Sequence, residues 1–376
     1  MTAIQTVERL ANALEVRWAN GAQSTFHYIW LRDNCPKTRD PQTNHRVNES
    51  SAIVRDVIAV SAMVGVSGCL NVKWSDGHES SFDSNWLLRY DYSNGVRRTK
   101  IKPVLWDASI GDAMPSANYA NIIASPDARR VFLANFRDYG VALLHEVPTV
   151  SGTVSDVGKL FGQIRTTSWG EVFDVRSIED ANSLAYTSLP LLLHTDEGYR
   201  DPAPTMQLTH FLVCESEGGQ ATLVDGFKVA EDLRKQAPEK FDLLVKTNLH
   251  YWFSDVDLVL ENDAATIELT PDGDIKSVRF SNHSVQPFLI RSDKMEAFYD
   301  AYMTYGAMRE STQYRVQLRM NAGDMYIVNN RRVMHGRTGF TKGGSRHLQS
   351  CYVEIDEVLG RLAALERENM GESSTH

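Results

Sequence analysis

Alternating hydrophobic and polar positions mark the first hundred residues as a region of short β-strands. The alternation is clearest over Leu14–Trp18, Ser24–Trp30 and Leu70–Trp74. A period of two residues is typical of strands that bury one face, and turn-forming pairs such as Asn20-Gly21 separate the runs. We therefore expect a small β-rich domain over residues 1–100.

The remainder of the chain mixes strands with a few helices. Apolar residues recur at helical spacing over Pro126–Phe136, Pro238–Val245 and 356–368. Strand-like runs cover Val141–Leu144, Met206–Val213, Ala221–Val224, Tyr314–Arg319 and Leu348–Glu354. Strands outnumber helices and no regular βαβ rhythm appears, which favours a β-sandwich or jelly roll over a doubly wound parallel sheet. We predict a mainly β fold with flanking helices over residues 101–376.

Composition and charge exclude several classes of binding partner and location. The chain has 376 residues and a formal net charge of −9, so it lacks the basic surface that binding to nucleic acid requires. It contains no run of about 18 apolar residues and no apolar leader, so we expect neither a membrane span nor a secretory signal, and a cytoplasmic location. The four cysteines are scattered without paired spacing, which predicts reduced thiols.

Two histidines and a carboxylate follow apolar runs in a pattern that suits a metal. His194 and Asp196 end the run that begins at Pro190, and their spacing on a strand places both side chains on one face. His335 ends a second apolar run far along the chain and precedes a glycine. Two imidazoles and one carboxylate form the triad that holds Fe(II) while leaving positions open for a cosubstrate and O2.

An arginine completes this pattern. Arg346 lies eleven residues after His335 and could pair with a dicarboxylate such as 2-oxoglutarate. Taken alone, a His-x-Asp pair is more often a coincidence at a strand end, and a single arginine is more often an ordinary ion-pair partner. The order of the three elements favours the metal site.

These segments resemble the γ-butyrobetaine hydroxylase and trimethyllysine dioxygenase group of Fe(II)/2-oxoglutarate oxygenases. The matching segments are 182–187, 194–196, 218–227, 321–324, 335–337 and 345–348, and in the N-terminal part 30–35 and 74–78. The likeness therefore covers nearly the whole chain.

The resemblance implies a double-stranded β-helix (jelly-roll) catalytic domain, a small N-terminal domain and a homodimer. It implies that His194, Asp196 and His335 ligate iron and that Arg346 holds the distal carboxylate of 2-oxoglutarate. It also implies hydroxylation, with succinate and CO2 as coproducts. The family places a hydroxyl residue directly after Gly-Gly-x, where this chain has Ala221, so Thr222 is the candidate replacement, although one step along a strand reverses the face.

The same resemblance points to a substrate pocket. Relatives enclose a trimethylammonium group in aromatic rings, and the matching positions here are Trp169, Phe173, Tyr186 and Tyr352. Further candidate substrate residues are Ser183, Glu197, Tyr199, Asn282 and His283. Because Glu197 would repel a substrate carboxylate unless Arg200 or a protonated His283 intervenes, we expect a quaternary ammonium substrate with a different polar end. The alternative is that Glu197 points away and pairs with Arg200.

Relatives also hold zinc in the N-terminal domain with three cysteines and a histidine. This chain keeps Cys35 and His78 but has no further cysteine nearby, and two ligands are too few for a closed tetrahedral site. His45 or Asp40 are the possible replacements. We expect no structural zinc, with Cys35 a buried thiol.

Three other functions compete with this one. The same iron chemistry could act on a non-betaine small molecule, with the aromatic rings lining an apolar pocket. The chain could be a non-catalytic metal-binding scaffold, although a decayed site would have lost at least one of His194, Asp196, His335 and Arg346. A cupin-like isomerase or hydrolase would work without O2 or 2-oxoglutarate.

Overall fold

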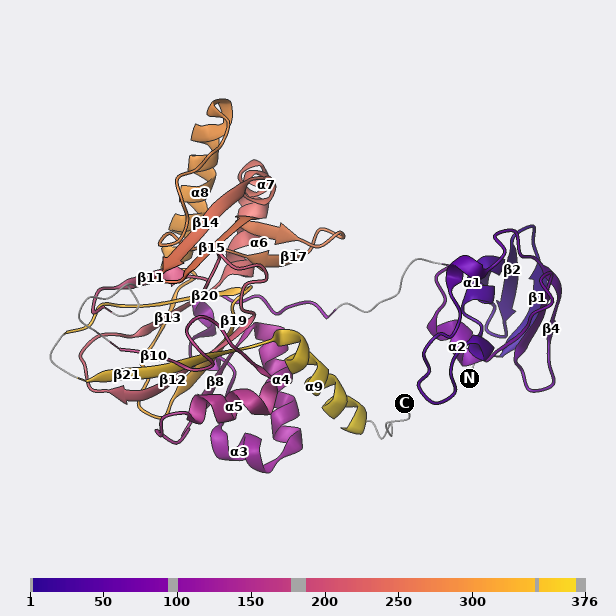
Figure 1. Ribbon diagram of the computed structural model, residues 1–376, viewed down its shortest axis with the longest axis horizontal. Helices are drawn as coiled ribbons and strands as arrows, with labels where there is room; N and C mark the ends of the chain where they lie inside the picture. The colour runs from indigo at the N-terminus through magenta and orange to yellow at the C-terminus, as the bar shows by residue number, and fades with distance from the viewer. Residues whose placement is uncertain (1–2, 94–100, 177–186, 342–344, 370–376) are drawn as a thin grey trace. The chain divides into compact units, whose positions relative to one another are not determined.

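The computed structural model describes residues 3–93, 101–176, 187–341 and 345–369. The chain divides into two compact units, Met1–Ile101 and Lys102–Ser373 (Figure 1). No helix in the described ranges is long and apolar enough to cross a membrane.

The first unit contains two antiparallel sheets of three strands each. They are β1 (Ile4–Arg9), β2 (Ala13–Trp18) and β3 (Gln23–His27), followed by β4 (Ala59–Val64), β5 (Leu70–Trp74) and β6 (Glu79–Phe82). One short helix follows the last strand of each sheet: α1 (Tyr28–Asp33) follows β3, and α2 (Ser84–Arg89) follows β6. Asp83 caps α2 by accepting hydrogen bonds from the backbone N–H groups of Asn85 and Trp86.

The alternation seen in the sequence builds the core of this unit. Leu14, Val16 and Trp18 of β2 are buried, and so are Leu70, Val72 and Trp74 of β5. The strand expected over Ser24–Trp30 ends at His27, because the chain turns into α1 at Tyr28. The strand expected over Ser24–Trp30 is therefore wrong over its last three residues, which belong to α1.

The second unit is built on two sheets. The larger has the order β10-β21-β12-β19-β8-β7, with β9 also pairing with β21, and the smaller has the order β11-β20-β13-β18. The larger sheet consists of β7 (Ser116–Asn118), β8 (Val141–His145), β9 (Ile164–Arg165), β10 (Phe173–Val175), β12 (Met206–Cys214), β19 (Met325–Asn329) and β21 (Arg346–Val353). The smaller consists of β11 (Leu191–His194), β13 (Ala221–Asp225), β18 (Val316–Leu318) and β20 (Val333–Arg337). All pairings are antiparallel except β7 with β8.

The strands β8, β12, β19 and β21 of the larger sheet have an outer face that packs on helices. Met206 and Leu208 of β12 and Cys351 and Val353 of β21 pack in one cluster with residues of α4, α5 and α9. The helices on this side are α3 (Tyr119–Ala124), α4 (Pro126–Tyr139), α5 (Thr153–Phe161) and α9 (Ile355–Asn369) (Figure 1). The intervening residues of β12 and β21 therefore face the other sheet, and apolar side chains of both sheets meet between them.

A third layer of helices and hairpins carries its own core. It comprises α6 (Gly226–Gln236), α7 (Pro238–Lys246), α8 (Met295–Glu310), and the hairpins β14 (Asn248–Asp255) with β15 (Leu258–Ala265) and β16 (Ile267–Leu269) with β17 (Ile275–Val278). Arg309 of α8 is buried, and its guanidinium donates a hydrogen bond to the carbonyl oxygen of Leu193 in β11. The layer thus supports the strand that leads to His194.

Candidate metal centre and cavity

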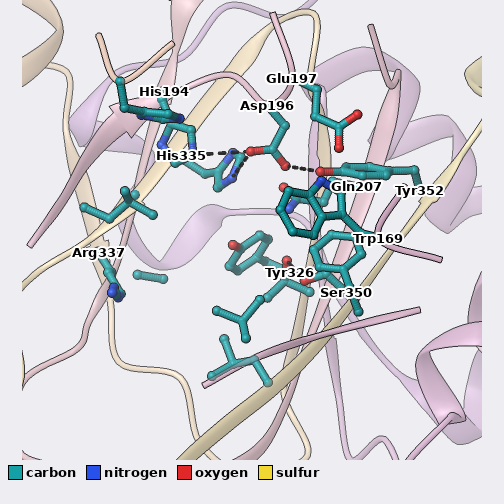
Figure 2. A pocket seen from close by; sticks show the side chains of 18 of the residues that line it. Trp169, His194, Asp196, Glu197, Gln207, Tyr326, His335, Arg337, Ser350 and Tyr352 are labelled. Carbon is teal, nitrogen blue, oxygen red and sulfur yellow. Dashed lines mark hydrogen bonds and ion pairs between the residues drawn. The ribbon is translucent and has the colours of Figure 1, made fainter. Parts of the chain in front are cut away.

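The structure brings together the three residues expected to bind a metal. β11 and β20 are neighbouring strands, and their register places His194 opposite His335. Asp196 lies two residues beyond the end of β11, where its Oδ1 is 3.2 Å from Nε2 of His194 and 3.4 Å from Nε2 of His335 (Figure 2). In the described part of the chain, this is the only group of three His, Cys, Asp or Glu residues that could hold a metal ion.

The glycine after His335 allows the two strands to approach. A Cβ at Gly336 would lie 2.5 Å from the carbonyl oxygen of Leu191 and 3.0 Å from the backbone nitrogen of Leu193. Both contacts are to backbone of β11, so a side chain there would push β11 away. The His-Gly pair in the sequence therefore reflects the close packing that sets the distance between the two imidazoles.

Hydrogen bonds, charge and burial set the orientation and the pKa values of the three candidate ligands. Nδ1 of His194 lies 2.9 Å from the carbonyl oxygen of Leu192 and donates to it, so Nε2 is the nitrogen that faces Asp196. Nε2 can donate to the carboxylate when the ring is protonated and can bind a metal when the ring is neutral. Burial alone would raise the pKa of Asp196, but the charges and hydrogen bonds of His335 and His194 hold that pKa well below its usual range. Burial lowers the pKa of His335, which favours the neutral imidazole that metals require. With both imidazoles in the neutral form and the carboxylate ionised, the three groups form a donor set that fits Fe(II).

A cavity of about 470 Å³ opens in front of these ligands. Several expected substrate residues line it, namely Trp169, Phe173, Glu197, Tyr199, His283 and Tyr352 (Figure 2 labels three of them). The ring centroids of Phe173 and Tyr352 are 5.3 Å apart. Ser183 and Tyr186 lie outside the described residues. Asn282 does not line the cavity, and its Oδ1 accepts a hydrogen bond from the hydroxyl of Tyr302 at 2.8 Å.

Two arginines form the cationic side of the cavity. Arg346 begins β21, and its guanidinium carbon lies 5.2 Å from the ring centroid of Phe340. Gly219 makes room for it, since a Cβ there would lie 3.2 Å from Nε of Arg346. Arg337, two residues after His335, also lines the cavity, and burial followed by repulsion from Arg346 lowers its pKa to about 10. Both side chains remain cations near neutral pH.

The structure does not bring Thr222 to the cavity. In the pairing of β13 with β20, Thr222 lies opposite Gly336, while Ala221 lies opposite Arg337 and Leu223 opposite His335. Because paired residues share a face, Thr222 points away from the metal ligands and Ala221 lines the cavity instead. The suggestion that Thr222 replaces the family hydroxyl is corrected by this register.

Glu197 combines a left-handed backbone conformation with a buried side chain. Its backbone adopts φ of +50°, its side chain is only 4% exposed, and Oε2 accepts a hydrogen bond from Nε of Arg200. Among the described residues, no donor lies within hydrogen-bonding distance of Oε1. Burial and the nearby charge of Asp196 raise the pKa of Glu197 against the opposing effect of Arg200. Arg200 supplies the cation beside Glu197, since its Nε donates to Oε2. Burial and His194 lower the pKa of His283 to about 4.

Sequence reasoning missed several cavity residues. Arg337 could have been found from its period-two spacing after His335. Gln207 and Tyr326 face the cavity from β12 and β19, and Trp252 and Phe253 reach it from β14. The last two lie in a hairpin that the sequence pattern did not predict, and they carry no motif.

In the N-terminal unit, Nε2 of His78 lies 3.2 Å from Sγ of Cys35. Within the described ranges, no third candidate ligand joins this pair. Asp40 instead accepts hydrogen bonds from Gln42 and Thr43 in its own turn. The expectation that this unit holds no structural zinc stays a prediction.

Comparison with known proteins gives the class. Residues 101–352 match the family described as taurine catabolism dioxygenase TauD, TfdA family, and residues 6–89 match the gamma-butyrobetaine hydroxylase-like N-terminal family. The chain therefore belongs to the TauD, TfdA dioxygenase family. With its two histidines and one aspartate, it is an Fe(II)- and 2-oxoglutarate-dependent dioxygenase.

Two relatives align with nearly the whole chain. It is 34% identical to gamma-butyrobetaine dioxygenase of Pseudomonas sp. (strain AK-1), over 98% of this chain and 97% of that protein. It is 29% identical to the mitochondrial trimethyllysine dioxygenase of Homo sapiens, over 92% of this chain and 83% of that protein. A solved structure of a putative alpha-ketoglutarate-dependent taurine dioxygenase from Burkholderia xenovorans superposes with a TM-score of 0.50 at 14% identity, covering 68% of this chain and 92% of that one. That likeness supports the mainly β fold.

Proposed function

We propose that the protein hydroxylates a small quaternary ammonium compound, with succinate and CO2 as coproducts. The observation that carries the proposal is that the His-Asp-His triad, Arg346 and several aromatic rings line one cavity. A substrate held by the rings would therefore lie beside the metal and the cosubstrate.

The walls of the cavity suit a cation that cannot donate hydrogen bonds. Trp169, Phe173 and Tyr352 present ring surface, and a quaternary ammonium group is attracted to aromatic faces. Asp196 and Glu197 add negative charge to the cavity, while Arg337 and Arg346 supply its positive charge. The cavity is thus polarised, with groups for a cation and groups for an anionic cosubstrate.

The residues of the chain have separate tasks in this reaction. When bound, Fe(II) supplies the activation of O2 for insertion into a C–H bond. Arg346 pairs with the distal carboxylate of 2-oxoglutarate, as the resemblance implies, and its position on β21 fixes the cosubstrate relative to the triad. The aromatic walls decide which substrate carbon faces the metal, and this positioning is the main contribution of the protein.

The polar end of the substrate is set by Glu197 and its neighbours. The ion pair with Arg200 supports the alternative in which Glu197 is neutralised within the wall, whereas the unpartnered Oε1 supports a substrate with a hydrogen-bond donor. We propose a polar end other than a simple carboxylate. Replacing Glu197→Asn separates the two cases, because an unchanged substrate profile leaves only the internal ion pair.

The experiment that tests the function is succinate release under air with Fe(II), ascorbate and 2-oxoglutarate. The panel contains γ-butyrobetaine, trimethyllysine, trimethylaminoethylphosphonate and choline, with His194→Ala as the blank. We expect one quaternary amine to stimulate turnover strongly, and tetramethylammonium to compete with it. Turnover on a non-quaternary compound that tetramethylammonium does not inhibit would favour the non-betaine alternative.

The resemblance extends to assembly and architecture. We propose a jelly-roll arrangement of the two sheets, a homodimer and a cytoplasmic location. Light scattering on the purified chain tests the dimer, which a monomeric mass at micromolar concentration would exclude.

A further inference from the structure

The two carboxylate oxygens of Asp196 have different partners. Oδ1 faces both imidazoles, whereas Oδ2 accepts a hydrogen bond from the hydroxyl of Tyr352 at 2.8 Å (Figure 2). A tyrosine hydroxyl is protonated at neutral pH, so it is the donor in this contact. The hydrogen bond occupies the oxygen that does not face the histidines.

Tyr352 is held firmly enough to orient its partner. It lies on β21 between two neighbouring strands, where it pairs with Gln207 of β12 and Arg165 of β9. Its side chain is buried, and its ring packs against Phe173. Its direction is therefore fixed by the sheet and by the neighbouring ring, independently of the loop that carries Asp196.

We propose that Tyr352 is a positioning residue that holds Asp196 as a metal ligand through Oδ1 alone. A carboxylate that binds a metal through both oxygens takes an additional coordination position. The triad must leave positions open for the cosubstrate and O2, so engaging Oδ2 keeps one of them free. Groups that hydrogen-bond to metal ligands commonly set the orientation of those ligands and the affinity for the metal.

Tyr352 then has two roles. Its ring belongs to the cavity wall, while its hydroxyl belongs to the support of the metal site. The second role is separate from the substrate, so it can be tested without knowing which amine is hydroxylated. Failure of the proposed substrate class would leave the result unaffected.

The test is anaerobic calorimetric titration of the full chain with Mn(II) and with Co(II), without substrate. Tyr352→Phe keeps the ring and removes the hydroxyl, and we expect it to weaken metal binding by about 10- to 100-fold. The visible absorption of the Co(II) complex should also change, because the carboxylate is free to rotate. Wild-type affinity together with a wild-type Co(II) spectrum would overturn the proposal.

The matched control is Tyr305→Phe. The buried hydroxyl of Tyr305 donates to the carbonyl oxygen of Gly226 at 3.2 Å, so this change also removes a buried tyrosine hydrogen bond. We expect it to leave metal affinity unchanged, and an equal loss in both variants would reduce the effect to general destabilisation. If circular dichroism shows that Tyr352→Phe does not fold, Tyr352→Met provides a second variant without the hydroxyl, and the same criteria apply.

Discussion

Asn330 holds Asp196 by both of its main-chain groups. Its Oδ1 accepts a hydrogen bond from the backbone N–H of Asp196 at 2.7 Å, and its Nδ2 donates to the carbonyl oxygen of Asp196 at 3.1 Å. Nδ2 also donates to the carbonyl oxygen of Pro204 at 2.9 Å. Because Asn330 lies in the turn between β19 and β20, it ties the carboxylate ligand to the strand that carries His335.

Replacing Asn330→Ala should therefore weaken both folding and metal binding. Each buried polar group that loses its partner costs about 1–3 kcal/mol, so urea unfolding should show a loss of at least that size. Asn118→Ala, which removes only an exposed hydrogen bond to Glu146, should stay within about 0.5 kcal/mol. Equal stability and Mn(II) affinity in Asn330→Ala and the wild type would contradict this role.

The close packing of β20 against β11 at Gly336 can be tested by substitution. Gly336→Ala places a Cβ against the backbone of β11, so we expect a loss of activity and a lower melting temperature. Gly360→Ala is the matched control, since Gly360 lies in α9 with no atom near its Cβ position. That change should stabilise the protein by about 1 kcal/mol through helix propensity. If both alanines raise the melting temperature, the close approach of β11 and β20 is not what the glycine serves.

Arg346 should determine the affinity for 2-oxoglutarate. Losing a charge-assisted hydrogen bond costs about 1.5–3 kcal/mol, so Arg346→Met should raise the KM for 2-oxoglutarate by roughly 10- to 100-fold. The control is Arg361→Met, whose exposed guanidinium donates only to the carbonyl oxygen of Leu160. A KM for 2-oxoglutarate that does not move in Arg346→Met would remove Arg346 from the cosubstrate site.

Asp174 links the strand that carries Phe173 to β21. Its Oδ1 lies 2.6 Å from Nε2 of His347 and accepts from Nε2 of Gln349 at 3.0 Å. Burial would raise the pKa of Asp174, but these hydrogen bonds lower it below its ordinary value. A carboxyl group with a lowered pKa stabilises the fold above its unfolded pKa of about 4, and that stability is lost as the pH falls through the folded pKa.

Comparing the wild type with Asp174→Asn at two pH values tests this link. At pH 5 the wild type should be more stable to urea by an amount within about 0.2–1 kcal/mol, the usual range for a partly exposed pair. The difference should shrink at pH 3. A difference that grows as the pH falls has the wrong sign for a lowered pKa.

The metal ligands could be predicted because their signal is local. His194 and Asp196 follow one apolar run and His335 ends another, and a strand ending in a ligand is recognisable without knowing which strands pair. The register of β11 with β20 then brings the two histidines together. Arg346 was predicted in the same way, from its spacing after His335.

The remaining residues depend on pairing and packing that the sequence pattern does not reveal. Thr222 and Ala221 differ by one step along β13, and only the register with β20 decides which faces the cavity. The helix α8 was missed although Phe298, Tyr302, Tyr305 and Arg309 are buried at helical spacing. Exposed apolar side chains such as Met303 blur that stripe. Trp252 and Phe253 were also missed, because they lie in a hairpin that the sequence pattern did not predict and carry no motif.

The most direct measurement follows the oxygen atoms under ¹⁸O2 with the quaternary amine that gives the fastest succinate release. We expect one labelled atom in succinate and one in the hydroxylated amine, with succinate formed in equal amount to the amine consumed. His335→Ala should give neither product. Succinate formed with the amine recovered unchanged would contradict the account, because the cavity would then bind the cation without presenting its C–H bond to the metal.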